Sequence, residues 1–303
     1  MKNSSFQMVG LWGRPGQVLV EHTLDHLISW LQKKGCTPVL ESSTAVFLPD
    51  RGLQIASSSM LGEICDMVIV VGGDGCLLGA ARALARHSMP ILGVNRGQLG
   101  FLTDILPNEL EVQLERIFEG RYTIEQRFLL DGSLTRDGHM IAAGEALNDV
   151  VLHAGKAVQM INFELHVNGE FVYSQKSDGL IVATPTGSTA YALSAGGPMM
   201  HPGLDAIALV PMCPHTLTNR PFVVAGGVEI KLALGESRGV IPHISFDGQP
   251  SIPAQPGDVI YIRKKPHRLR LIHPHEYTFY AAARSKLGWA SRLTGQESHY
   301  DDQ

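Results

Sequence analysis

The chain has 303 residues, of which 44% are hydrophobic, and this is enough to fill the cores of two domains. Its formal net charge of -4 argues against a general polyanion-binding surface, so we expect no nucleic-acid partner. The four cysteines lie far apart, the N-terminus has no apolar leader, and no run is long enough to span a bilayer. We therefore expect a cytoplasmic protein with no membrane partner.

Strand and helix patterns alternate over the first 121 residues. Short apolar runs predict strands at residues 7–11, 37–40, 67–71 and 90–94. Helical spacing or composition predicts helices at residues 18–33, 76–86 and 110–118, and the serines at 57–59 suit a helix cap or a loop. This alternation predicts an open parallel α/β sheet of the Rossmann type with right-handed crossovers.

From residue 122 onward the pattern changes to strand-like runs separated by turns, with Asn168-Gly169 as the strongest hairpin signal. These runs cover residues 127–134, 142–152, 159–167, 170–175, 180–184, 222–234, 241–246 and 258–270. We predict an α/β domain at 1–121, a β-sandwich domain at 122–272, and a C-terminal segment at 273–303 that packs back on the first domain. A helix is expected within residues 277–293. The basic run at 263–265, with Arg268 and Arg270, is interpreted as the solvated side of a strand.

The stretch from residue 67 to 80 combines a buried strand with a glycine turn and the start of a helix. Gly72, Gly73 and Gly75 allow a bulky anion to approach the backbone, and the helix dipole favours negative charge there. Asp74 puts a carboxylate in the same turn. It either abstracts a proton or shares a cation with a bound phosphate, or it simply caps the helix, and the turn alone leaves these readings open.

Several common sites are absent from the sequence. No glycine-lysine phosphate loop occurs, and no Gly-x-Gly-x-x-Gly opens the first helix, so a dinucleotide redox cofactor is not supported. We expect no metal-binding pair among the 13 histidines.

Two further clusters place polar residues in apolar surroundings. Asn148-Asp149 interrupts an apolar run, either as a turn or bulge or because both side chains face a ligand. The apolar run at 180–183 leads into a Thr- and Ser-rich turn at 184–191, followed by Ser194 and a glycine pair. Loops of this kind often carry function, so we interpret this segment as a ligand cradle.

Taken together, these pieces resemble the NAD kinase family. The likeness rests on the Gly72–Gly75 turn, on Asn148-Asp149, and on Asp178 followed by the segment 186–191. It extends to residues 210–217, to the Phe246-Asp247-Gly248-Gln249 turn, and to the closing sequence at 286–289. The glycine turn alone is shared with lipid kinases and some phosphofructokinases, whereas the hydroxyl-rich segment is more specific.

The resemblance implies transfer of the γ-phosphoryl group of ATP to the 2′-hydroxyl of the adenosine ribose of NAD, giving NADP. Asp74 would accept the hydroxyl proton, and Gly72, Gly73 and Gly75 would bind phosphate. The residues that the resemblance places against NAD are Asp74, Gly75, Asn148, Asp149, Gln159, Lys176, Asp178, Thr186, Thr189, Ala190, Tyr191, Ala192, Leu193, Ser194 and Gln249. The family commonly has glutamate at the position of Asp149, and often arginine or glycine at that of Lys176.

The phosphate turn itself contains no lysine, so positive charge must come from the helix terminus and from a divalent metal. We expect Mg²⁺ or Mn²⁺, held mainly through ATP. The resemblance also suggests a homodimer or homotetramer built through the β domain. The rival readings are a lipid or sugar kinase, and a nucleotide-sensing module without catalysis, in which Asp74 would be only a turn residue.

Overall fold

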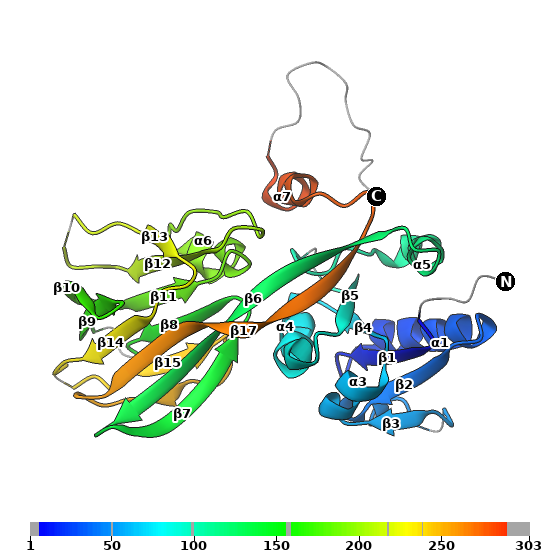
Figure 1. Ribbon diagram of the computed structural model, residues 1–303, viewed down its shortest axis with the longest axis horizontal. Coiled ribbons are helices and arrows are strands. Elements are labelled where there is room, and N and C mark those ends of the chain that lie inside the picture. The colour runs from blue at the N-terminus through cyan, green and yellow to red at the C-terminus, as the bar shows by residue number, and fades with distance from the viewer. Residues whose placement is uncertain are drawn as a thin grey trace, which may run out of the picture.

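The structure is a computed structural model that describes residues 6–49, 51–97, 100–155, 159–216, 218–237 and 239–289. The part of the expected C-terminal segment from 290 to 303 lies outside the described residues. Two β-rich halves lie side by side, joined by two long strands (Figure 1). No helix within the described ranges is both long and apolar enough to cross a bilayer.

The N-terminal half is a parallel sheet with β4 (Met67–Gly72) buried along its whole length. Its strand order is β3-β2-β1-β4-β5, and all four of these strand pairs are parallel. The flanking strands are β1 (Met8–Gly13), β2 (Thr37–Glu41), β3 (Gln54–Ala56) and β5 (Pro90–Asn95). The predicted open parallel architecture is therefore confirmed.

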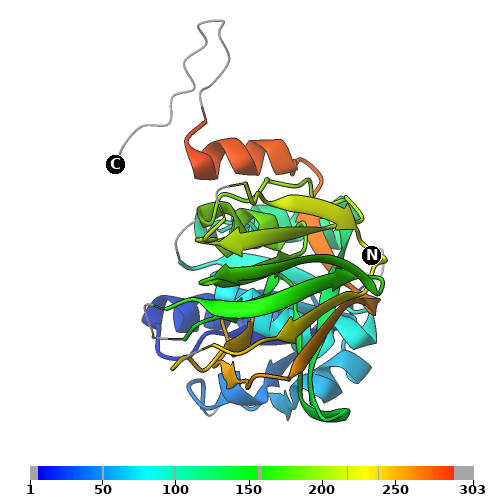
Figure 2. The ribbon, with the colours of Figure 1, turned by 90° about the vertical axis from the view of Figure 1, so that its left-hand side faces the viewer.

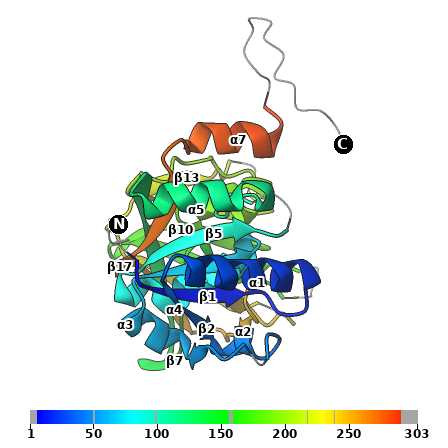
Figure 3. The same cartoon turned by 90° about the vertical axis from the view of Figure 1, so that its right-hand side faces the viewer.

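Helices cover both faces of this sheet. The first face packs against α1 (Val18–Lys33) and α5 (Leu110–Phe118), which lie in front of the sheet in Figure 3. The opposite face packs against α3 (Ser58–Ile64) and α4 (Asp74–Leu84). The bounds of α1 and α5 match the sequence prediction. Ser57 accepts a hydrogen bond from the Met60 N–H, so of the two readings of residues 57–59 the helix cap is the one observed. A single turn, α2 (Ser42–Ala45), follows β2.

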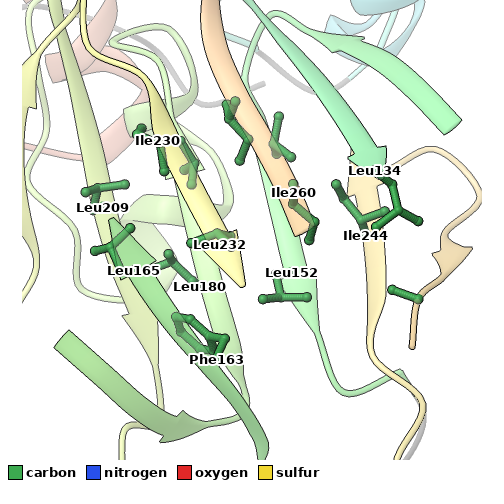
Figure 4. Packing of buried hydrophobic residues seen from close by; sticks show 14 of the residues in the cluster. Leu134, Leu152, Phe163, Leu165, Leu180, Leu209, Ile230, Leu232, Ile244 and Ile260 are labelled. Carbon is green, nitrogen blue, oxygen red and sulfur yellow. The ribbon is translucent and has the colours of Figure 1, made fainter. Parts of the chain in front are cut away.

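The C-terminal half is a sandwich of two antiparallel layers, seen from its own side in Figure 2. The first layer is a six-stranded sheet composed of β13 (Phe222–Ala225), β12 (Ala206–Met212), β11 (Gly179–Ala183), β8 (Asp149–His153), β15 (His243–Phe246) and β16 (Ile252–Pro253). The second layer contains β10 (Glu170–Ser177), β9 (Ile161–Val167), β14 (Ile230–Leu234), β17 (Val259–Pro274), β6 (Tyr122–Arg136) and β7 (His139–Ala146). Between the layers lies an apolar core that includes Phe163, Leu180 and Ile260 (Figure 4). Asn168 and Gly169 both have positive φ in the β9–β10 turn, as the hairpin prediction requires.

Two strands run through both halves and make the second layer continuous with the parallel sheet. The N-terminal part of β17 pairs with β14, and its C-terminal part pairs in parallel with β5, from Arg270 opposite Pro90 to Ile272 opposite Leu92. The other edge of β17 pairs with β6 along nearly its full length. The chain end after the sandwich thus returns to the α/β half. The domain limits at residues 121 and 272 stay a prediction, because β6 and β17 belong to both halves.

Two predicted strands are in fact pairs of strands, and three strands were missed, namely β12 and the short strands β3 and β16. The run at 142–152 divides into β7 and β8, which lie in different sheets on either side of Leu147-Asn148. The run at 222–234 divides likewise into β13 and β14 around a glycine turn. Strand β12 was not expected, because Pro211 interrupts its apolar run.

The remaining helices are short or terminal. A 3₁₀ turn, η3 (Gly187–Thr189), and α6 (Tyr191–Ser194) hold the hydroxyl-rich segment. Two further 3₁₀ turns, η1 (Ala85–His87) and η2 (Pro107–Glu109), follow α4 and precede α5. The last helix, α7 (Phe279–Leu287), lies across the top of the molecule in the three overall views (Figures 1 to 3). It begins at the N-cap Thr278 and ends at Gly288, whose φ is positive.

Candidate functional site

A cleft of about 530 Å³ lies over the six-stranded sheet of the β half. It is lined by Asn148, Asp149, Val151, His153, Ala154, Gly155, Asp178, Ala190, Tyr191, Met212, Ser245, Asp247 and Gly248. Five of the predicted NAD-site residues therefore lie together, although they come from separate parts of the sequence. We call this space the β-half cleft.

Asp247 organises the floor of the β-half cleft. Its buried carboxylate accepts hydrogen bonds from the backbone N–H groups of Leu147 (3.0 Å) and Asn148 (2.7 Å), and pairs with Arg82 on α4 at 2.7 Å. Asn148 therefore stands where the chain crosses between sheets, and it also lines the cleft. That the dipeptide faces a ligand stays a prediction. Asp247 has no predicted role from the sequence, although the Asp247-Gly248 pair is a recognisable turn signal.

Asp149 is a buried carboxyl group beside a second one. Burial, with a smaller contribution from the charge of Asp247, raises the pKa of Asp149 to about 7. Ionised carboxylates lose hydration on burial, so the protonated form is favoured. Asp149 can therefore change charge near neutral pH, inside the cleft.

An Asp149→Asn variant should become more stable than the parent protein as the pH rises. Since the folded-state pKa lies above the ordinary value of 3.8, the native state loses stability on this account as pH rises from about 4 through about 7. One pKa unit corresponds to about 1.4 kcal/mol. The free energy of unfolding of the variant should therefore exceed that of the parent protein by a few kcal/mol at pH 8 and by little at pH 4. Urea denaturation at both pH values measures this. An equal difference at the two pH values would contradict the ionisation of Asp149.

Most hydroxyl groups of the segment 184–191 bond within the protein rather than pointing into open space. Thr184 donates to the Leu147 carbonyl (2.5 Å), Ser188 to the Pro185 carbonyl (2.6 Å), and Thr189 to the Thr186 carbonyl (3.2 Å). These bonds shape the turn. Its residues that line the β-half cleft are Ala190 and the half-exposed Tyr191.

Asp74 is the first residue of α4, and it does not line the β-half cleft. Its carboxylate accepts hydrogen bonds from the Phe101 N–H (2.6 Å) and the Leu102 N–H (3.1 Å), with the Thr103 hydroxyl at 3.3 Å. The side chain is partly buried, and one edge of it is fixed by this loop. A carboxylate has about four acceptor sites, so these bonds leave it further capacity.

A second cleft, of about 410 Å³, lies at the carboxyl ends of β1 and β4. It is lined by Trp12, Gly13, Arg14, Pro15, Ser43, Gly75, Cys76 and Gly79. The helices that follow β1 and β4 lie on opposite faces of the sheet, and in open α/β sheets ligands bind in the crevice at such a point. We call this space the switch-point cleft. Arg14 is exposed beside it.

Helix α4 connects the two clefts. Gly75 and Gly79 line the switch-point cleft, whereas Arg82 binds Asp247 on the floor of the β-half cleft. An α-helix rises about 1.5 Å per residue, so Asp74 and Arg82 lie about 12 Å apart along the helix axis. The glycine turn at residues 72–75 is therefore held at a fixed distance from Asp247 of the β-half cleft.

Neither cleft is lined by the other predicted site residues. Gln249 borders a separate depression with Arg82, Lys176 and Gln159 are exposed on the β half, and Ala192 is buried in a small apolar cluster. The set without a place in the lining of either cleft is Gly72, Gly73, Asp74, Gln159, Lys176, Thr186, Thr189, Ala192, Leu193, Ser194 and Gln249. Their roles stay predictions.

A buried polar chain runs from the loop at 101–104 to the hydroxyl-rich segment. The ring of His273 lies between the carboxylates of Asp104 and Glu125, and Arg127 bonds both Glu125 (2.7 Å) and the Thr186 hydroxyl (3.1 Å). Burial opposes the charge on Glu125, but bonds from His273 and Arg127 outweigh it and lower the pKa of Glu125 to about 2. Sequence reasoning missed this chain, because its members are not neighbours in the sequence.

Comparisons with known proteins agree with the arrangement of two halves. The sequence model of the ATP-NAD kinase N-terminal domain matches residues 9–122, and that of the ATP-NAD kinase C-terminal domain matches residues 147–274. Among curated relatives, an NAD kinase of Marinobacter nauticus is 59% identical over 95% of this chain and 98% of its own length. An NAD kinase of Pseudomonas syringae pv. tomato is 57% identical over 96% of this chain and 98% of its own.

Solved structures show the same fold. A yeast NADH kinase, solved with NADH, superposes with a TM-score of 0.83 at 24% identity, over 97% of this chain and 91% of its own. An NAD kinase from Archaeoglobus fulgidus, solved with ATP, gives a TM-score of 0.72 at 26% identity, over 93% of this chain and 98% of its own.

Proposed function

The chain belongs to the ATP-NAD kinase family and is a phosphotransferase that acts on NAD, and from this premise we propose how its residues divide the reaction. The γ-phosphoryl group of ATP passes to the 2′-hydroxyl of the adenosine ribose, giving NADP. The observation that carries our assignment is that one helix, α4, begins at the glycine turn, lines the switch-point cleft, and pairs through Arg82 with Asp247 of the β-half cleft.

The β-half cleft is our site for NAD. Its amide, carboxyl and aromatic groups at Asn148, Asp149, Asp178 and Tyr191 suit the hydrogen-bonding edges and rings of a dinucleotide. A kinase acting on a small sugar would not need a cleft of about 530 Å³ lined partly by apolar residues. Hydrogen bonds from the Leu147 and Asn148 N–H groups to Asp247 hold the backbone where the chain crosses between the sheets.

The switch-point cleft and the turn before α4 are our site for ATP. The first N–H groups of α4 have no partner within the helix, and the positive end of its dipole attracts phosphate. A Cβ atom at Gly73 or Gly75 would meet nothing within 4 Å, so a phosphate can approach the backbone there. Arg14 adds a cation at the edge of the cleft.

Asp74 is our general base. As the ribose oxygen bonds to the γ-phosphorus, the bond from that phosphorus to the ADP oxygen breaks, and the hydroxyl proton goes to the Asp74 carboxylate. The Phe101 and Leu102 N–H groups orient this carboxylate, which a base needs for a defined line of approach. The proton must go to a lone pair of the Asp74 carboxylate that does not already accept a bond from residues 101–103.

We also propose a requirement for Mg²⁺ or Mn²⁺. The described residues contain no group of three or more His, Cys, Asp or Glu side chains that could hold a metal, but Mg²⁺ is usually bound by one or two carboxylates together with substrate phosphates. Here the phosphates of ATP would supply most of the metal's ligands, so that the Asp74 carboxylate stays available for the proton. When bound, the metal neutralises charge on the phosphate oxygens.

Incubating the purified chain with ATP, Mg²⁺ and NAD tests the reaction and the metal requirement. We expect NADP, measured with an NADP-specific dehydrogenase, and its loss when EDTA is added. Replacing NAD with a sugar or a diacylglycerol should give no phosphorylated product. A nucleotide-sensing protein would bind ATP and form no NADP.

A Gly75→Ala variant should separate stability from ATP binding. Alanine in place of a helical glycine stabilises a helix by up to about 1 kcal/mol, and the added Cβ has no neighbour within 4 Å in the free protein. The same Cβ would stand in the path of the phosphates. We expect an equal or higher melting temperature with a raised KM for ATP and an unchanged KM for NAD, measured by steady-state kinetics. An unchanged KM for ATP would place the phosphates elsewhere.

The location and assembly of the protein are further proposals. The four cysteines are free thiols, as in the reducing cytoplasm. We propose a homodimer or homotetramer built through the β half. Its edge strands β10 and β13 expose Phe171, Val172 and Val223, which supports this interface.

A further inference from the structure

The last helix, α7, spans the two sides of the proposed active site. At its first turn, the rings of Phe279 and Tyr280 pack on His201, with centroid distances of 5.1 and 5.8 Å. His201 directly follows Met200, whose N–H donates to the Ser188 hydroxyl of the hydroxyl-rich segment. The start of α7 is thereby anchored to the β half.

The last turn of α7 lies over the loop that holds Asp74. The Lys286 ammonium is 4.5 Å from the centroid of the Phe101 ring, and the Phe101 N–H is the group that donates to Asp74 at 2.6 Å. Phe101 thus contacts both Lys286 and the proposed base Asp74, although these two residues lie more than two hundred positions apart in the sequence. The chain reaches this place because β17 returns to the α/β half beside β5.

Lys286 has no hydrogen-bond acceptor in the described part of the chain, although its Nζ atom is buried. Burial lowers the pKa of Lys286, and the charges of Asp74 and Asp104 act in the opposite direction. A buried ammonium without an acceptor is costly, whereas an aliphatic side chain of the same length could pack on Phe101 without that cost. The packing of α7 therefore does not explain why this residue is charged.

Resting on the function proposed above, we propose that Lys286 is a catalytic cation, whose ammonium binds the oxygens of the phosphoryl group that is transferred beside Asp74. The phosphate turn contains no lysine, and α7 brings one to it from the other end of the chain. The flexible stem of lysine lets the ammonium move from the Phe101 ring to an arriving phosphate. Lys286 remains protonated throughout, and the hydroxyl proton still goes to Asp74.

Three variants of the full chain test this assignment. Lys286→Met removes the charge and keeps the length, Lys286→Arg keeps the charge, and Arg284→Met removes a charge from an exposed position of the same helix. Removing one group that stabilises transition-state charge costs about 10²–10³ in kcat, so we expect a loss of this size for Lys286→Met. Lys286→Arg should recover part of the rate, and Arg284→Met should match the parent protein.

Melting temperatures distinguish a catalytic role from a structural one. Since the ammonium lacks an acceptor, Lys286→Met should melt no lower than the parent protein while its kcat falls. A fall in kcat that is accompanied by a lower melting temperature would assign Lys286 to packing and overturn the proposal. An unchanged kcat would overturn it as well.

A binding measurement separates this proposal from the NAD kinase reaction itself. Millimolar inorganic tripolyphosphate should raise the melting temperature of the parent protein and of Arg284→Met, and should leave that of Lys286→Met unchanged. This readout needs no NADP formation, so it decides on Lys286 even if the assay with ATP and NAD fails. Equal shifts in all three proteins, or none in the parent protein, would overturn the assignment.

Discussion

Asp74→Asn should lower turnover by about 10²–10⁴, because an amide cannot take up the ribose proton during transfer. The KM for ATP should stay close to that of the parent protein, since the backbone of the phosphate turn is unchanged. Steady-state formation of NADP measures both quantities.

Two comparisons make the Asp74 experiment specific. The amide also weakens the bonds from Phe101 and Leu102, so the melting temperature of the variant must be measured beside its rate. Asp137→Asn is a matched control, because Asp137 is exposed and has a positive φ that asparagine tolerates. Turnover close to that of the parent protein in Asp74→Asn would remove Asp74 from the base role.

Gly187→Ala should both destabilise the protein and damage the NAD site. A Cβ atom at Gly187 would lie 2.1 Å from the carbonyl oxygen of Asn148, which already accepts a hydrogen bond from the Thr184 N–H at 2.8 Å. The backbone must move apart at the wall of the β-half cleft. Overpacking of this kind costs about 1–3 kcal/mol, and the displaced Asn148 should raise the KM for NAD.

Urea denaturation and NAD kinetics check the Gly187 prediction. The control is Gly227→Ala, because a Cβ at Gly227 would meet no atom within 4 Å. This control should keep the free energy of unfolding and the KM for NAD of the parent protein. Equal behaviour of the two variants would mean that the contact between residues 187 and 148 does not hold the cleft.

Local patterns were sufficient to predict the four longer helices, α1, α4, α5 and α7, and most of the strands. Periodic leucines and isoleucines gave the full bounds of α1, and a run of β-branched residues gave the buried centre of β4. The apolar pattern could not show that the chain crosses between the sheets at Asn148 and at Gly226. The spacing of apolar residues indicates which side chains are buried, but it does not indicate which strand pairs with which. The parallel pairing of β17 with β5 joins residues about 180 positions apart, so no local signal marks it.

The candidate site was predictable where polar residues interrupt apolar runs. Asn148, Asp149, Asp178, Ala190 and Tyr191 were singled out in this way or by family likeness, and they meet in one cleft. Asp247 and Arg82 were missed, because their importance comes from a contact between α4 and the β half. Lys286 was missed for the same reason, since its relation to Asp74 exists only after β17 has returned to the first sheet.

The two strands shared by both halves limit how this protein could be divided. A fragment that stops near residue 121 would contain β5 but neither β6 nor β17, and the edge of β5 that pairs with β17 would be left bare. Bare edges of this kind pair with other chains and promote aggregation. The N-terminal family segment is therefore not a free-standing unit, and fusions, insertions or split versions of this kinase should keep residues 122–136 and 259–274 together with it.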